Sequence, residues 1–85
     1  MDNKFLNKVL DQLVSETTID YDEEEVFVPF HPFYFLSLFY SPNLDVLSLL
    51  YFSNHCRDVY GLNEQEIKYV WKEYKETIKD KINNG

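Results

Sequence analysis

Glycine is nearly absent from this sequence of 85 residues, which has it only at Gly61 and Gly85. A loop that cradles phosphate needs several glycines close together, so that backbone N–H groups can approach the anion. A glycine-rich nucleotide-binding loop is therefore excluded. Proline is also scarce, with three residues. Together the two low counts argue against a low-complexity or disordered chain and favour one folded domain over residues 1–85.

Cysteine occurs once, at Cys56, so the chain cannot form an internal disulfide. Small secreted domains usually depend on several disulfides, and we therefore expect a cytoplasmic location. The soft metal ligands are limited to His31, His55 and Cys56. A structural zinc site needs four ligands, and adjacent residues of a helix point about 100° apart. We expect no metal site, no cofactor, no small-molecule substrate and no catalytic activity.

Positive charge is scarce: eight lysines and arginines face 15 acidic residues, which leaves a net charge of −7. The whole excess lies upstream of Asn63, where ten acids accompany Lys4, Lys8 and Arg57. Such a surface repels phosphate backbones, so we expect no direct nucleic-acid partner. The densest acidic cluster comprises Asp20, Asp22, Glu23, Glu24 and Glu25.

This acidic cluster does not form a calcium-binding loop of the helix-loop-helix type. A loop that begins at Asp20 needs glycine at its sixth position and glutamate at its twelfth, which are Glu25 and His31 here. The cluster is typical of a solvated turn. Four of its residues are also candidates for contact with a basic protein partner: Asp22, Glu23, Glu24 and Glu25.

A long uninterrupted hydrophobic run is missing as well. Residues 33–52 come nearest to one, but the segment SPNLD at 41–45 interrupts them at the centre, where a charge is most costly in a bilayer. We expect a buried core segment here. Membrane association through 33–52 is kept as an alternative.

Three segments carry apolar residues at the spacing of an amphipathic helix, and we predict helices over 3–16, 42–60 and 64–82. Ser41-Pro42 is a helix start signal, Gly61 is placed to end the second helix, and Asn63 with Glu66 forms a variant capping box. The core-facing stripe of the first helix includes Phe5, and Leu50, Tyr51, Val59 and Tyr60 continue the helical spacing in the second. The predicted fold is an all-α three-helix bundle with a helical hairpin at its C-terminus.

Between the first two helices the pattern changes. Two short β-prone runs flank the acidic cluster, and we predict a small β-hairpin within 17–30 as a departure from the all-α class. Residues 33–40 are too few for periodicity to distinguish a helix from a strand. We favour a short helix, because Pro32 suits a first helical position.

Aromatic residues are abundant, with seven phenylalanines, seven tyrosines and one tryptophan. Either they fill the core, or some form an exposed surface of the kind that dominates binding energy. If they are exposed, the candidate partner-binding residues are Tyr34, Phe35, Phe39, Tyr40 and Tyr51.

Two parts of the chain resemble small proteins of marine tailed phages to which no activity is attached. They are HCRDVYGLNEQEIKYVW at 55–71, and DQLVSET at 11–17 followed by IDYD at 19–22. The resemblance implies a phage-encoded accessory or structural protein and carries no functional residue.

These observations favour a non-enzymatic interaction or assembly module that associates with itself or with a protein partner. The alternative from another class is an acidic inhibitor, which mimics the charge of nucleic acid and occupies a basic groove of a host protein.

Overall fold

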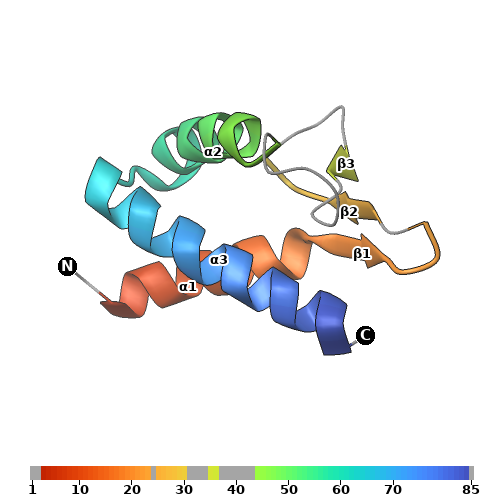
Figure 1. Cartoon of the computed structure of the whole chain (residues 1–85). Helices are drawn as coiled ribbons and strands as arrows, with labels where there is room; N and C mark the ends of the chain where they lie inside the picture. The colour runs from red at the N-terminus through yellow and green to blue at the C-terminus, as the bar shows by residue number, and fades with distance from the viewer. Residues whose placement is uncertain (1–2, 24, 31–34, 37–43, 85) are drawn as a thin grey trace.

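A computed structural model describes residues 3–23, 25–30, 35–36 and 44–84. This part of the chain is mostly helical, as predicted, with α1 (Asn3–Glu16), α2 (Leu44–His55), the π-helical turn η1 (Cys56–Tyr60) and α3 (Glu64–Asn84). Figure 1 shows α1 and α3 crossing side by side in the same direction, while α2 runs the opposite way across them. The two termini lie at opposite ends of the molecule (Figure 1).

A small antiparallel sheet corrects the all-α prediction. The predicted hairpin is confirmed: β1 (Thr18–Asp20) pairs with β2 (Glu25–Phe27), with Ile19 opposite Val26. A third strand, β3 (Phe35–Leu36), pairs with the other edge of β2. The predicted helix over 33–40 is therefore wrong at 35–36. Residues 35–36 are extended because they pair with the free edge of β2, and a two-stranded hairpin gains stability from a third strand.

Along β2 and the residues that follow it, successive side chains point to opposite faces, as extended backbone requires. Val26, Val28 and Phe30 are buried, whereas Phe27 between them is exposed. The segment that leaves β2 thus continues to insert apolar side chains beneath α2 and against α3.

Both α1 and α3 form because their apolar residues recur every three or four positions and face each other. Leu6, Val9 and Leu13 are buried on α1, and five residues are buried on α3: Ile67, Val70, Trp71, Tyr74 and Ile78. Burial of each such large side chain contributes about 1.5–3 kcal/mol. Phe5 corrects the predicted core, since it lies at the edge of this interface and is 42% exposed.

The second helix changes its winding before it ends. Residues 56–60 form a π-helical turn, and Gly61 follows in the left-handed conformation with φ 67°. The N–H groups of Gly61 and Leu62 donate to the carbonyls of Arg57 and Cys56, each at 3.2 Å. Gly61 is thus confirmed as the end of the helix. The predicted start signal at Ser41-Pro42 lies outside the described residues.

The start of α3 confirms the capping box. The Asn63 N–H donates to Glu66 Oε1 and the Glu66 N–H donates to Asn63 Oδ1, both at 2.9 Å. These reciprocal bonds satisfy two backbone donors near the helix start. The helix then continues to Asn84, two residues beyond the predicted end.

Four aromatic rings occupy the centre of the core and join three parts of the chain. Phe30 follows β2, Phe52 belongs to α2, and Trp71 and Tyr74 belong to α3. The Phe52 and Trp71 ring centroids lie 4.8 Å apart, and those of Phe30 and Phe52 lie 5.2 Å apart, edge to face. These four rings fill the core, so only part of the aromatic content can serve a surface.

Candidate interaction surface

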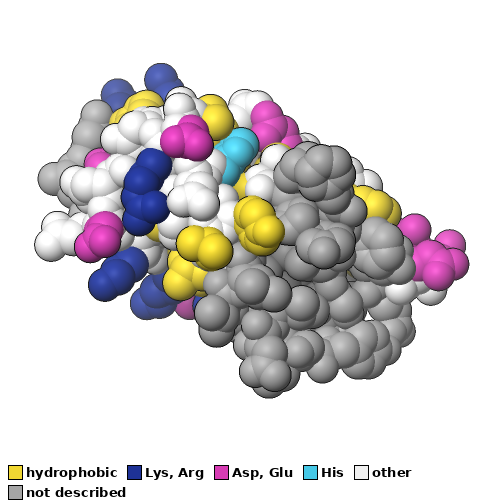
Figure 2. Space-filling model, turned by 90° about the horizontal axis from the view of Figure 1, so that it is seen from above, with side chains coloured by type: hydrophobic (Ala, Val, Ile, Leu, Met, Phe, Trp, Pro, Cys, Tyr) yellow, Lys and Arg dark blue, Asp and Glu magenta, His cyan; other side chains and the backbone are white. Residues whose placement is uncertain are grey.

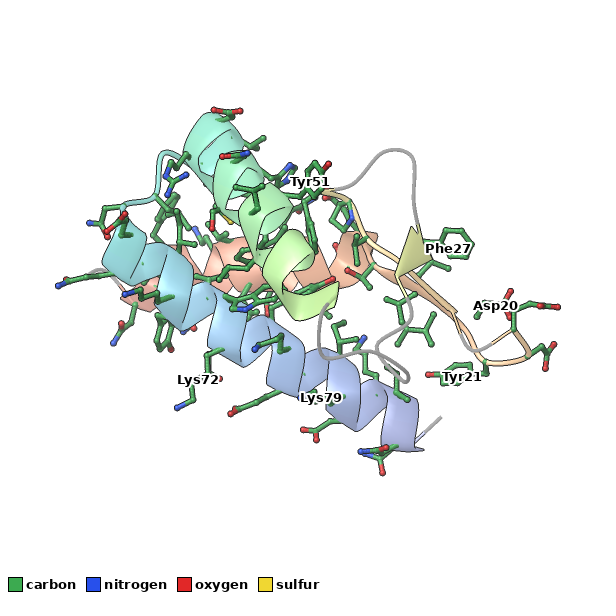
Figure 3. The ribbon with its side chains drawn as sticks, turned by 45° about the horizontal axis from the view of Figure 1, so that its top comes forward. Asp20, Tyr21, Phe27, Tyr51, Lys72 and Lys79 are labelled. Carbon is green, nitrogen blue, oxygen red and sulfur yellow. The ribbon has the colours of Figure 1, made fainter. Side chains whose placement is uncertain are left out.

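The structure places one of the five predicted aromatic partner-binding residues on the surface. Tyr51 lies on α2 and is 40% exposed, and Figure 3 shows it on the side of α2 toward the sheet. Phe35 belongs to β3. Tyr34, Phe39 and Tyr40 lie outside the described residues. The predicted aromatic surface is thus represented here by Tyr51.

The acidic residues lie at the tip of the hairpin. Asp22 and Glu23 are exposed in the turn between β1 and β2, Glu25 begins β2, and Glu24 lies outside the described residues. Asp20 shapes the turn, because its Oδ1 accepts the N–H groups of Asp22 and Glu23, both at 3.1 Å. The Tyr21 hydroxyl donates to the carbonyl of Lys81 at 3.1 Å, which joins this turn to the last turn of α3.

The second helix carries an exposed apolar surface of which Tyr51 was the one predicted member. Leu49, Leu50, Tyr51 and Val59 are between 37% and 59% exposed, and we call these four residues the α2–η1 apolar surface. Successive helical residues point about 100° apart, so the run Leu49–Phe52 cannot face the core throughout. Since Phe52 is fully buried, its three predecessors face outward or sideways. That run was a signal in the sequence that could have revealed the surface.

The π-helical turn explains why Val59, which continues the predicted helical spacing, is exposed. A π turn contains more residues than an α turn, so each residue advances less around the helix axis. Cys56 at the start of η1 is fully buried. Val59, three residues later, has not completed a turn of the π-helix, so it faces away from the core and is 59% exposed. Tyr60 is half-buried against the core.

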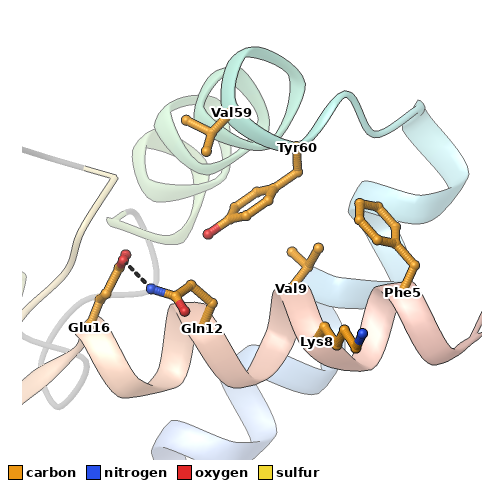
Figure 4. Close-up of a pocket in the computed structure, with 7 residues that line it drawn as sticks. All are labelled: Phe5, Lys8, Val9, Gln12, Glu16, Val59 and Tyr60. Atoms are coloured by element: carbon orange, nitrogen blue, oxygen red, sulfur yellow. Dashed lines mark hydrogen bonds between the residues drawn. The ribbon is translucent and has the colours of Figure 1, made fainter.

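An open pocket of about 450 Å³ lies between α1 and η1. Its lining consists of Phe5, Lys8, Val9, Gln12, Glu16, Val59 and Tyr60 (Figure 4). Val9 is buried, whereas Phe5 and Val59 expose apolar side chains. The pocket therefore extends the α2–η1 apolar surface toward α1.

Two polar residues of α1 that line this pocket, Gln12 and Glu16, are joined by a hydrogen bond. Gln12 Nε2 donates to Glu16 Oε1 at 2.6 Å, and Figure 4 shows the Tyr60 hydroxyl pointing toward these two residues. Burial raises the pKa of Tyr60, and the neighbouring charges of Glu16 and Cys56 raise it further. Tyr60 therefore stays protonated at neutral pH and can offer a hydroxyl donor.

A second, smaller pocket of about 190 Å³ lies between α2 and the beginning of α3. Its lining consists of Leu49, Ser53, Arg57, Glu64, Ile67 and Lys68. Ile67 is buried and Leu49 is partly exposed, while Arg57 and Lys68 are exposed. The pocket combines an apolar interior with two cationic side chains and one carboxylate.

His55 and Cys56 do not form a pair of catalytic type. Cys56 is fully buried, and burial raises the pKa of its thiol to about 12. The thiolate, which is the nucleophilic and metal-binding form, is therefore suppressed at neutral pH. The His55 ring instead packs edge-on against Tyr60, with centroids 5.9 Å apart.

Within the described residues, no group of three or more His, Cys, Asp and Glu side chains is placed to hold a metal ion. No helix in the described part of the chain combines the length and the apolar character needed to cross a membrane.

Comparison of the chain with protein-family models, with curated proteins and with solved structures finds no match.

Proposed function

We propose that this chain is a non-enzymatic protein-interaction module that contacts its partner through the α2–η1 apolar surface. The observation that carries the proposal is the exposure of Leu49, Leu50, Tyr51 and Val59 on one short stretch of helix. Exposed apolar side chains on one element are typical of association surfaces, because their removal from water drives binding.

The neighbouring pocket supports this function. It lies against Val59 and is bounded by Phe5 from α1, so a partner that covers η1 could insert an apolar side chain beside them. The protonated Tyr60 hydroxyl and the Gln12–Glu16 pair would orient a polar group of that partner. Such an arrangement, an apolar contact beside polar groups, is common in protein interfaces.

Enrichment of partners with paired baits tests the proposal. The wild-type chain and a Leu50→Glu, Val59→Glu variant are expressed as tagged baits in cells that contain an untagged copy of the chain. We expect a defined set of proteins, with the untagged copy as one candidate, to be lost from the variant. A Glu76→Lys bait, altered on the exposed surface of α3, serves as the control and retains the set.

Equal recovery by the wild-type chain and the double variant would contradict the proposal, provided that circular dichroism shows both to be folded. Light scattering after size-exclusion chromatography then establishes whether the partner is another copy of the chain. An oligomer of the wild type that the double variant converts to a monomer identifies self-association.

The exposed carboxylates of Asp22 and Glu23 favour a second candidate function, the acidic inhibitor that mimics nucleic-acid charge. The two functions differ in their salt dependence. Exposed charges are screened within about 8–10 Å at physiological ionic strength, so a charge mimic loses affinity steeply as salt increases. Binding through the α2–η1 apolar surface does not.

A further inference from the structure

Positive charge is concentrated on one side of this acidic protein. Lys68, Lys72, Lys75 and Lys79 are separated by four, three and four residues, which places them along one line of α3. Four of the five acids of α3, Glu66, Glu73, Glu76 and Asp80, fall on another flank of the same helix by the same spacing rule. The fifth, Glu64, precedes Lys68 by four residues and lies at the start of the lysine line. With Arg57, the four lysines form what we call the basic flank, and they are five of the eight basic residues in the chain.

The basic flank borders the α2–η1 apolar surface. Arg57 and Lys68 line the 190 Å³ pocket together with Leu49 and Ile67. Farther along α3, Lys75 Nζ lies 5.1 Å from the centroid of the Trp71 ring. Trp71 in turn packs on Phe52 of α2. Figure 2 shows basic and hydrophobic side chains next to each other on the face seen from above.

The basic flank has the length of a short helix. Lys68 and Lys79 are 11 positions apart on α3, which corresponds to about 17 Å at the rise of an α-helix. A partner helix of about three turns spans the same distance. Its apolar face could cover Leu49 and Leu50 and place one side chain in the pocket, while carboxylates beside that face meet the lysines.

We propose that the basic flank and the adjoining pocket bind an acidic amphipathic helix of a protein partner, an inference that rests on the proposed interaction function. Charge complementarity identifies the chemistry of the partner, because the cations lie beside the apolar contact. An extended polyanion is a poorer fit, since DNA or an anionic bilayer would also meet the acids that produce the net charge of −7. A short helix contacts this one face.

Direct binding of synthetic peptides tests the proposal. The probe is a fluorescein-labelled helical peptide with leucines along one face and glutamates beside them, and its affinity is measured by fluorescence anisotropy. One comparison peptide replaces every glutamate by lysine, and another has the same composition in scrambled order. We expect the acidic amphipathic peptide to bind at least about tenfold more tightly than either of them at low salt.

Variants of the chain then locate the site. Lys68→Glu combined with Lys72→Glu is expected to weaken binding about tenfold, and Leu49→Asp to weaken it by a similar factor. Lys4→Glu combined with Lys81→Glu changes the net charge by the same amount at positions that lie outside the basic flank and line neither pocket. This control is expected to retain affinity within about twofold.

Three results would overturn the inference: equal binding of the lysine peptide, an equal loss in the Lys4→Glu, Lys81→Glu control, or stronger binding to phosphatidylserine-containing vesicles than to the acidic peptide. The proposed function has a separate readout in the bait experiment. If Leu50→Glu, Val59→Glu abolishes partner recovery but no acidic peptide binds, the interaction function stands and the acidic helix is the wrong partner.

Discussion

At the scale of single residues, the hydroxyl groups of Thr17 and Tyr74 meet at the edge of the core. The Thr17 hydroxyl donates to the carbonyl of Leu13 at 2.8 Å, so Tyr74, whose hydroxyl lies 2.7 Å from Thr17 Oγ1, must be the donor in that contact. Tyr74 thus joins α3 to Thr17, the residue that follows α1. Burial raises its pKa to about 12, despite the opposing effect of the hydrogen bond with Thr17.

Tyr74 and Cys56 together predict that the protein loses stability in alkali. Both groups have folded-state pKa values of about 12, against ordinary values of 10.0 and 9.0. A pKa that is raised on folding stabilises the protein below its unfolded value and loses that effect as pH rises toward the folded value. We expect each group to lower the free energy of unfolding by about 1.4 kcal/mol per pH unit in this window.

Urea unfolding at intervals from about pH 8 to pH 12 measures this loss. The Tyr74→Phe variant is the control, because its unfolding free energy should fall less steeply above pH 10, the ordinary pKa of tyrosine. An unfolding free energy of the wild type that is constant up to pH 12 would contradict the prediction.

At the scale of elements, local signals determine where the helices stop and start. Gly61 ends the second helix and the Asn63–Glu66 box begins the third one immediately afterwards. Only Leu62 separates them, and it is buried. This short connection holds α2 and η1 against α3 and so positions both pockets.

Substitution of Gly61 tests the contribution of this connection. A Cβ added at Gly61 meets nothing within 4 Å, so the effect of Gly61→Ala arises from the backbone alone. We expect it to reduce the free energy of unfolding by about 1–2 kcal/mol, because a left-handed backbone is unfavourable for L-residues. Thermal unfolding followed by circular dichroism measures the change.

Gly61→Asn is the matched comparison, because asparagine adopts the left-handed conformation more readily than alanine. It should be destabilised less than Gly61→Ala. If both variants have the melting temperature of the wild type, the connection does not depend on the left-handed residue.

At the scale of the whole molecule, the four-ring cluster makes the helices and the sheet dependent on one another. Phe30 enters it from the sheet side, Phe52 from α2, and Trp71 with Tyr74 from α3. Each ring contacts rings from another element. Loss of one ring should therefore weaken all the elements together.

Phe52→Ala is expected to reduce the free energy of unfolding by about 3–5 kcal/mol, because it removes a fully buried ring and leaves a cavity. Leu50→Ala, two residues earlier and 56% exposed, should change it by less than about 0.5 kcal/mol. Urea unfolding followed in parallel by Trp71 fluorescence and far-ultraviolet circular dichroism measures both. A similar small change in the two variants would show that Phe52 does not anchor the core.

The sequence predicted the features that depend on neighbours along the chain. Apolar spacing predicted α1 and α3, β-prone runs around an acidic turn predicted the hairpin, and Gly61 with the Asn63–Glu66 box predicted the break between helices. Each rests on backbone and side-chain preferences within a few residues, which a single sequence contains in full.

The candidate surface was predicted less well. Tyr51, Asp22 and Glu23 are exposed as expected, but Leu49, Leu50 and Val59 were not identified, and Phe5 was assigned to the core. The basic flank was not among the predicted partner-binding residues. Its role depends on α2, which brings Leu49 and Arg57 against Lys68.

Only the tertiary structure decided which apolar side chains the core could accept. The sequence by itself determined the helices, the hairpin and the break between the second and third helices, because these follow from local periodicity and caps. The third strand required an edge of β2, and the exposure of Val59 followed from the π-helical winding of η1. An apolar residue is buried only where another element covers it, and that depends on packing between segments far apart in the chain.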